Sequence, residues 1–559
     1  MAELAATVVG IVSTVGILGQ IFDGCVKAYA FFTSASNLGR DSERLVCKIR
    51  IEEMRLLVWG REWGVIEGKL EAHLQKESEM GNGRLRGLAV EILTELHRTI
   101  TDFRKLKERY GMKEERIEGG EMEKIGGSGS ASGSGGGKVA GRLRNELQLR
   151  AKWVIADKEK FTLLLRDLKD YNDGLEQLFP PGRLATLHRT WTNELLQSAH
   201  RDLEKLKTLE MAASTTYPQL NASASLKQLR INLDATPTTK FKQTYALKIQ
   251  RTNLSINKSL DSDLSRCHGS YQNPAGAGME DVVVEWIQYD KDDMDSRLNH
   301  VRRIDDLARM IHSSSDRHPD LNTLDCLGYT DEISSSRYGL VYKAPQGSSS
   351  NLNVLIQSND MRTPDLGDRF KLAHKLAVAL WSFHSLDWLH KNLCSSNILF
   401  FPSAFSASAK QTTAISASIP DISFPFVLGF DSSRPDGVDE MSVASKNSAM
   451  ADLHRHPHSL NGMSKKPYCK SFDIYSLGLI LLEIGLWKVL QAYYKPHHSA
   501  ERFRDKVVIQ NLVPNLNSKT GRLYREVVER CLFAKDDLSD QEAGQLMEFV
   551  VGTLESLRV

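Results

Sequence analysis

Residues 4–22 form a run of nineteen residues without a charged side chain. At 1.5 Å per residue, a helix over that run comes close to the roughly 30 Å thickness of a bilayer's hydrocarbon core. A helix that is apolar on all sides must be covered, either by other helices or by lipid. We expect burial in a soluble helical bundle, and the alternative is conditional entry into a membrane after release. The apolar side chains concerned are Leu4, Val8, Ile11, Val12, Val15, Ile17 and Leu18.

The composition is that of a globular protein with two to four domains, since the chain has 559 residues, 41% of them apolar and 25% charged. A formal net charge of +2 excludes a polyanion-binding field over the whole molecule, so we expect no nucleic-acid partner. The seven cysteines include no C-x-x-C pair, which argues against a disulfide framework and against a zinc finger. We therefore expect a reducing, cytoplasmic location. Glu3, rather than a basic region, precedes the apolar run, which argues against a signal peptide.

Apolar residues recur every three or four positions over residues 88–110 and 154–178, which predicts two amphipathic helices. A third stripe over residues 45–63 is interrupted by Glu52. Long helices with polar connections favour a helical bundle. The insert GGSGSASGSGGG at residues 126–137 is typical of a flexible tether.

The first 32 residues, MAELAATVVGIVSTVGILGQIFDGCVKAYAFF, resemble the opening of the HeLo domain of fungal heterokaryon-incompatibility and prion-inhibition proteins. The stretch KWVIADKEKFTLLLRDLKDYNDGLEQL, residues 152–178, is similar to the long helix of that domain. The resemblance covers about residues 1–210. It implies a helical bundle that self-associates and whose N-terminal helix leaves the fold to perturb a membrane, with the plasma membrane as its destination on activation.

From about residue 220 the pattern changes. Residues 282–286 and 337–345 read as β-strands, and an amphipathic helix begins at Arg369. The segments LHKNLCSSNILFF, FVLGFDSSRP and FDIYSLGLILLEIGLW follow in that order, which resembles a protein kinase catalytic core. The resemblance implies a bilobal α+β domain over residues 241–559. The polar residues 211–240 then form a loop-like linker, in which Pro218 and Pro237 argue against a long cross-β stack.

The residues that would catalyse phosphoryl transfer are degraded in the loop at 390–397. A kinase has H-R-D-x-x-x-x-N here, and its aspartate accepts the substrate's hydroxyl proton. This chain has His390, Lys391, Asn392 and Asn397. The amide of Asn392 accepts no proton at neutral pH, and losing a general base typically costs 10²–10⁴ in rate.

The nucleotide-binding positions implied by the resemblance are also altered. The D-F-G metal loop is matched by Gly429, Phe430 and Asp431, and glycine carries no ligand for Mg²⁺. Asp431 lies two positions late. Aligning the strand at 282–286 places Ile287 where the phosphate-pairing lysine belongs. Asp473 matches the aspartate that, in kinases, caps the backbone of the catalytic loop.

These losses predict a pseudokinase without a cofactor. Our leading hypothesis is a signalling protein in which the HeLo effector bundle is controlled by this pseudokinase, which responds to an upstream protein. One alternative is an atypical kinase that binds ATP and Mg²⁺ through Asp431. Another is a scaffold that only binds proteins.

Three histidines alternate in the sequence LHRHPH, at positions 454, 456 and 458. Such spacing can present imidazoles to a metal ion from an extended strand. No cysteine or carboxylate follows within a few residues, however, and Pro457 breaks the strand. We therefore expect a solvated loop.

Overall fold

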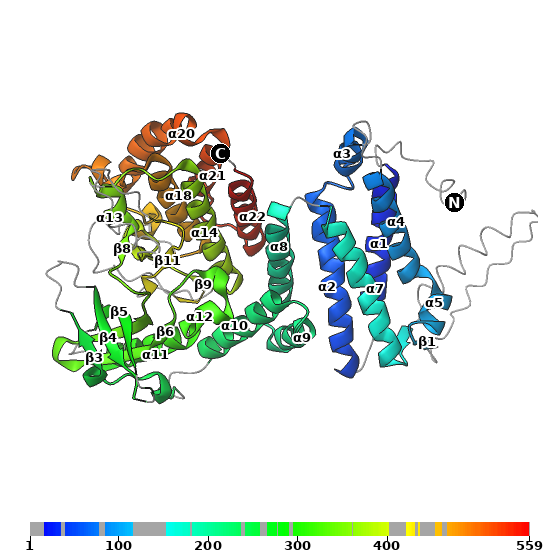
Figure 1. The fold of residues 1–559 in the computed structure, drawn as a ribbon, viewed down its shortest axis with the longest axis horizontal. Helices are drawn as coiled ribbons and strands as arrows, with labels where there is room; N and C mark the ends of the chain where they lie inside the picture. The colour runs from blue at the N-terminus through cyan, green and yellow to red at the C-terminus, as the bar shows by residue number, and fades with distance from the viewer. Residues whose placement is uncertain are drawn as a thin grey trace, which may run out of the picture. The chain divides into compact units, whose positions relative to one another are not determined.

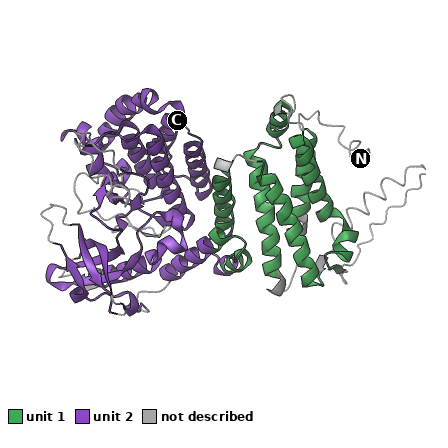
Figure 2. Ribbon diagram, in the orientation of Figure 1, with its two compact units in different colours: residues 1–198, 207–221 green, residues 199–206, 222–559 purple. Residues whose placement is uncertain are grey.

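The computed structural model describes residues 16–34, 40–77, 84–115, 152–178, 181–235, 241–257, 265–274, 276, 278–289, 294–359, 361–401, 421–430, 434–435, 453–460 and 467–557. The chain divides into two compact units (Figure 2). The first comprises residues 1–198 and 207–221, and the second comprises residues 199–206 and 222–559. All seven cysteines are free thiols.

The first unit is a helical bundle. Helices α1, α2, α4 and α7 run side by side and pack against one another (Figure 1). The helices of this unit are α1 (Ile17–Ser34), α2 (Arg40–Glu62), α3 (Lys69–Glu77), α4 (Arg84–Thr101), α5 (Phe103–Glu108), α7 (Lys158–Glu176) and α8 (Pro181–Ala199). Helix α9 (Leu203–Ala213) and helix α10 (Pro218–Ala235) each contain a boundary between the two units.

The predicted helical stripes are present, with two corrections at their ends. Residues 88–110 are divided between α4 and α5, because the Asp102 side chain accepts hydrogen bonds from the amides of Arg104 and Lys105 and so caps a new helix. Residues 152–155 are not helical. They form strand β2 (Lys152–Ile155), which pairs antiparallel with β1 (Met112–Glu115). The glycine-serine insert separates these two strands in sequence and lies outside the described residues.

Of the apolar run at residues 4–22, the structure describes only residues 16–22. Residues 17–22 are the first turns of α1, where Leu18 and Phe22 are buried and Ile17 is 58% exposed. Gly60 of α2 permits a close approach, since a Cβ atom there would lie 2.0 Å from the Phe22 ring. Leu4, Val8, Ile11, Val12 and Val15 lie outside the described residues. Among the helices that the structure describes, none combines the length and the apolar character needed to cross a bilayer.

The second unit contains a five-stranded antiparallel sheet and a helical part. The strands lie in the order β3-β4-β5-β7-β6, and α11 (Met294–Ile311) packs against β6 and β7. Their bounds are β3 (Leu254–Ile256), β4 (Arg266–Gln272), β5 (Met279–Gln288), β6 (Cys326–Glu332) and β7 (Arg337–Lys343). Short pairings join β8 (Ser350–Asn351), β10 (Ile398–Phe400) and β11 (Phe426–Val427), and likewise β9 (Trp388–Leu389) and β12 (Arg434–Pro435).

The helical part surrounds α18 (Lys470–Leu486), whose residues from Lys470 to Gly485 are all buried. Helices α14 and α21 pack against it, and α22 packs against both of these (Figure 1). The other helices here are α12 (Ser314–Arg317), α13 (Leu352–Gln357), α14 (Leu366–Ser385), α17 (Pro457–Leu460), α19 (Ala500–Arg502), the π-helix Phe503–Leu512, α20 (Val513–Thr520), α21 (Arg522–Leu532) and α22 (Asp540–Ser556).

The segment at residues 211–240 is largely helical, so its loop-like prediction is wrong. Pro218 does not break a helix but opens α10 at a position where its missing N–H costs nothing. The inward face of α10 buries Leu226 and Leu233 in the core of the second unit.

Candidate functional site

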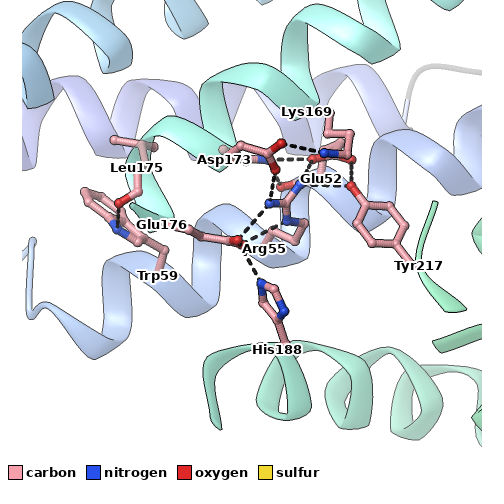
Figure 3. Close-up of polar contacts among 10 residues, drawn as sticks. Glu52, Arg55, Trp59, Lys169, Asp173, Leu175, Glu176, His188 and Tyr217 are labelled. Carbon is pink, nitrogen blue, oxygen red and sulfur yellow. Dashed lines mark hydrogen bonds and ion pairs between the residues drawn. The ribbon is translucent and has the colours of Figure 1, made fainter. Parts of the chain in front are cut away.

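A buried arginine organises the first unit. Arg55 lies on α2 within the stripe that Glu52 interrupts, and its side chain is only 2% exposed. All five N–H groups of its guanidinium have acceptors (Figure 3). Nε and Nη2 bind the two carboxylate oxygens of Glu176 at 2.9 and 2.8 Å. Such two-point pairing is the strongest geometry available to an arginine and a carboxylate.

The remaining donors of Arg55 reach three further residues. Nη2 lies 2.7 Å from Oδ1 of Asp173, and Nη1 lies 3.0 Å from Oε2 of Glu52 and 2.9 Å from the hydroxyl of Tyr217. Tyr217 in turn donates its own proton to Glu52. The guanidinium therefore connects α2 and α7 with the turn that precedes α10.

The outer part of the network holds these acceptors in place. Asn172 donates to the backbone oxygen and to Oε2 of Glu52, both at 2.9 Å. His188 of α8 lies 2.9 Å from Glu176, and Lys169 pairs with Asp173 (Figure 3).

The surroundings shift the carboxylate pKa values in different directions. Burial raises the pKa of Glu52, although the nearby Arg55 charge opposes this. For Glu176, burial is outweighed by hydrogen bonds from His188 and Arg55, which lower its pKa. What the network does chemically is lock helices together, because removing one partner from a buried ion pair leaves an uncompensated charge.

The sequence carries a signal for this network that the apolar stripe at residues 45–63 does not explain. Glu52 and Arg55, three residues apart on an otherwise apolar face, are a pair whose burial requires partners. The identity of those partners was not readable, because Tyr217 lies 162 residues after Arg55.

Of the predicted nucleotide-binding residues, Asn397 and Gly429 lie together in the second unit, beside the buried pair Arg266 and Glu285. Arg266 of β4 lies 2.7 Å from Oε1 of Glu285 on β5, and it donates a 2.8 Å hydrogen bond to the backbone oxygen of Ser396. Its Nη2 also donates to the Oδ1 atom of Asn397. Glu285 is the buried residue of β5 that reaches toward Gly429, whose amide lies 3.4 Å from its Oε2. Ile287 packs on the main core of the unit, two positions further along the same strand.

Asn397 and Gly429 are in direct contact with each other. The Nδ2 atom of Asn397 donates to the backbone oxygen of Asn392 at 2.6 Å. Gly429 has a φ of +93°, and a Cβ atom there would lie 2.3 Å from that Nδ2 atom. Phe430 is fully buried against the rings of Phe383 and His390. Asp431 lies outside the described residues.

These contacts do not suit a magnesium nucleotide. The amide of Asn397 is held by Arg266 and by Asn392. Gly429 carries no side-chain ligand for a metal ion, and the guanidinium of Arg266 is already paired with the carboxylate of Glu285.

Asp473 organises the loop at residues 390–397. Its carboxylate accepts hydrogen bonds from the amides of His390 and Lys391 at 2.8 and 2.9 Å, and from the hydroxyl of Tyr468 at 2.8 Å. Burial alone would raise the pKa of Asp473, but hydrogen bonding and attraction from His384 lower it. The backbone of Lys391 is left-handed, with a φ of +67°, which this cap stabilises.

The loop with three histidines is not solvated as expected. His454 and His456 are buried, and His454 pairs with Glu483 at 3.0 Å. His458 and His456 both face Asp536, which comes from the connection between α21 and α22.

Comparison with known families assigns both parts of the chain. The HeLo family, described as prion-inhibition and propagation, matches residues 7–209. That match indicates a signalling protein of the fungal incompatibility and cell-death type. A domain of unknown function, DUF7580, matches residues 247–549, which is more than half of the chain. The resemblance to protein kinases led us to expect a kinase family here, but no kinase family matches this region. No curated protein matches the chain. The chain therefore belongs to the DUF7580 family and carries a HeLo domain at its N-terminal end.

Proposed function

We propose that this protein is a cell-death switch in which the HeLo bundle is the effector and the second unit is a kinase-like regulator without phosphotransfer activity. In the resting state the apolar run at residues 4–22 is covered. On activation it is released to a membrane or to a second copy of the chain. The protein acts in the cytoplasm and reaches the plasma membrane when an upstream protein triggers it.

The topology of the second unit supports the kinase-like part of the proposal. In kinases the third strand carries the phosphate-pairing lysine and the following helix carries its glutamate partner. Here the third strand of the sheet is β5, and α11 follows it. The buried charged residue of that strand is Glu285, and its partner Arg266 is on the preceding strand. The charges are thus reversed and paired with each other.

The proposal rests on helix α10, whose first residues belong to the first unit and whose remaining residues belong to the second. Tyr217, just before the helix, completes the Arg55 network within the first unit. Further along the helix, Lys227 is buried in the second unit and pairs with Asp387 at 3.2 Å. Ser223 Oγ lies 2.8 Å from His318 Nε2, also within the second unit. A change in how the second unit holds α10 therefore acts on the residue that completes the buried network of the effector.

The test is dye release from liposomes with anionic or neutral lipids, using the full chain. Lys227→Glu places a carboxylate beside Asp387, so it detaches α10 from the second unit and should cause leakage. Ser225→Glu introduces the same charge at an exposed position of α10 and serves as the matched control. Adding Val15→Asp to the Lys227→Glu chain should abolish the leakage.

Each arm can contradict a different part of the proposal. A folded Lys227→Glu chain that releases no dye excludes control through α10. Leakage that survives Val15→Asp excludes the apolar run as the membrane-active element. Incorporation of phosphate from Mg²⁺-ATP by the wild-type chain excludes the non-enzymatic regulator.

A further inference from the structure

His456, His458 and Asp536 form a cluster outside both sites described above. One ligand atom from each side chain lies within 4.8 Å of the other two. No carboxylate follows the two histidines closely in the sequence. The fold supplies one from a position 78 residues later.

The carboxylate of Asp536 faces the two imidazoles with different oxygen atoms. Oδ2 lies 2.6 Å from Nδ1 of His458, and Oδ1 lies 3.7 Å from Nε2 of His456. The centroids of the two rings are 4.9 Å apart and the rings are inclined by 71°, so they do not stack on each other. This is the arrangement of a site with two histidines and one carboxylate.

The surrounding residues fix the ligands before any ion binds. The His456 ring stacks on Phe472 at 4.5 Å with an interplanar angle of 5°, and the edge of Tyr475 closes its other side. The backbone oxygen of Asp536 accepts a 3.2 Å hydrogen bond from the Cys469 thiol. Rigid support of this kind raises metal affinity because little ordering remains to be done on binding.

The donor set favours a borderline transition-metal ion. Zinc binds imidazole nitrogen and carboxylate oxygen at about 2.0–2.2 Å, usually with four ligands. Magnesium and calcium prefer sites made of oxygen alone. The ion replaces the proton that His458 and Asp536 share. The long 3.3 Å contact from the His458 amide to Nδ1 of His456 is given up, because a metal on Nε2 requires a proton on Nδ1.

We propose that His456, His458 and Asp536 bind one Zn²⁺ ion or a closely related divalent transition metal. The remaining coordination position is open to water, since His458 is partly exposed. The ion joins the segment at residues 453–460 to the connection between α21 and α22. It is a structural cross-link within the second unit and is independent of the proposed membrane function.

The experiment is calorimetric titration of the metal-depleted full chain with Zn²⁺, together with visible absorption after Co²⁺ addition. The wild-type chain should bind one equivalent and show the intense bands of low-coordinate Co²⁺. His458→Ala and Asp536→Asn should each weaken binding at least 100-fold. The double variant His497→Ala/His498→Ala removes an adjacent pair of histidines elsewhere in the second unit and should leave binding unchanged.

Folding is checked with the same samples by thermal unfolding. Zn²⁺ should raise the melting temperature of the wild-type chain but not that of His458→Ala, a variant at the partly exposed ligand. Absence of one-equivalent binding by the wild-type chain, or retention of binding by folded Asp536→Asn, overturns the proposal. Loss of binding in the double variant at His497 and His498 does the same.

Discussion

The guanidinium of Arg55 donates a 2.9 Å hydrogen bond to the hydroxyl of Tyr217, although 162 residues separate them. Tyr217 lies beyond residue 209, where the HeLo match ends. The aromatic ring also lies beside the guanidinium, 5.4 Å from its carbon, and packs edge-on against Trp191. The charge network of the HeLo bundle is therefore completed by a residue outside the matched domain, so a fragment cut at residue 209 lacks part of its own lock.

Tyr217→Phe removes the hydroxyl that accepts from Arg55 and donates to Glu52. Leaving these buried groups without a partner costs about 1–3 kcal/mol. We expect faster amide hydrogen exchange in α2 and α7, measured on the full chain. Tyr245→Phe is the matched control, because Tyr245 is 75% exposed. Unchanged exchange in α2 would show that the hydroxyl contributes nothing to the lock.

Arg55→Met preserves the bulk of the side chain but leaves Glu52 and Glu176 buried without their cation. The free energy of unfolding should fall by about 3–5 kcal/mol at pH 7. In the wild-type chain the pKa of Glu176 is lowered, so its stabilisation is present above the unfolded pKa of about 4.3 and is lost as pH falls.

In Arg55→Met, Glu52 and Glu176 lose their cation, so the pKa values of these two carboxyl groups should be raised. Protonation at lower pH then removes the unpaired buried charges and reduces the loss of stability. The stability difference between the two chains should therefore narrow from pH 7 to pH 4, as measured by urea unfolding at several pH values. A difference that grows with acidification would contradict the charge argument.

A double-mutant cycle can measure the interaction energy between Arg266 and Glu285. Arg266→Met alone leaves a buried carboxylate, and we expect a loss of about 3–5 kcal/mol. The combined variant Arg266→Met/Glu285→Met should be much closer to wild type, because no charge remains unpaired. Thermal unfolding of all four chains with and without Mg²⁺-ATP provides the measurement. A higher melting temperature of any of the four chains in the presence of Mg²⁺-ATP would contradict the conclusion that the site around Arg266 and Asn397 does not suit a magnesium nucleotide.

Asp473→Asn tests the cap on the loop at 390–397. The carboxylate accepts three hydrogen bonds from His390, Lys391 and Tyr468, and an amide presents only one acceptor oxygen. We expect a loss on the order of 3 kcal/mol in the second unit. Asp505→Asn is the control, since Asp505 is half-exposed and pairs only with the adjacent Arg504 among the contacts described for it.

The pH dependence of that cap follows from the lowered pKa of Asp473. Its stabilisation is present above the unfolded pKa of about 3.9 and disappears as pH falls through the lower folded value. Acid unfolding of the wild-type second unit should therefore show a component that Asp473→Asn lacks. Identical acid transitions in the two chains would contradict this.

Much of the helical architecture could be predicted from the spacing of apolar residues, since the stripes at 88–110 and 154–178 correspond to helices of the first unit. The break at Asp102 and the strand at residues 152–155 were missed, because capping and strand pairing depend on neighbours that periodicity does not show. Helix α10 was missed because the polar composition of residues 211–240 indicates a loop, whereas burial of Leu226 and Leu233 in the core of the second unit stabilises a helix there.

The buried polar sites were harder to predict, because their partners are distant in sequence. Glu285 stands in the apolar strand VVVEW, and an isolated charge in such a strand signals a buried partner. That signal does not identify Arg266. Likewise, the histidines at 456 and 458 were visible, but Asp536 became their neighbour only through the fold.

The contact between Gly429 and Asn397 also limits which residues position 429 can accept. Any side chain at position 429 would start 2.3 Å from the Asn397 amide, on a backbone with a φ of +93° that favours glycine. Asn397 is itself held by Arg266, which balances the charge of Glu285. A single substitution of Gly429 by aspartate therefore meets a steric and electrostatic barrier instead of an open position. Position 429 therefore accepts a side chain only if the bonds that hold Asn397 are given up as well, which couples any change there to Arg266 on β4.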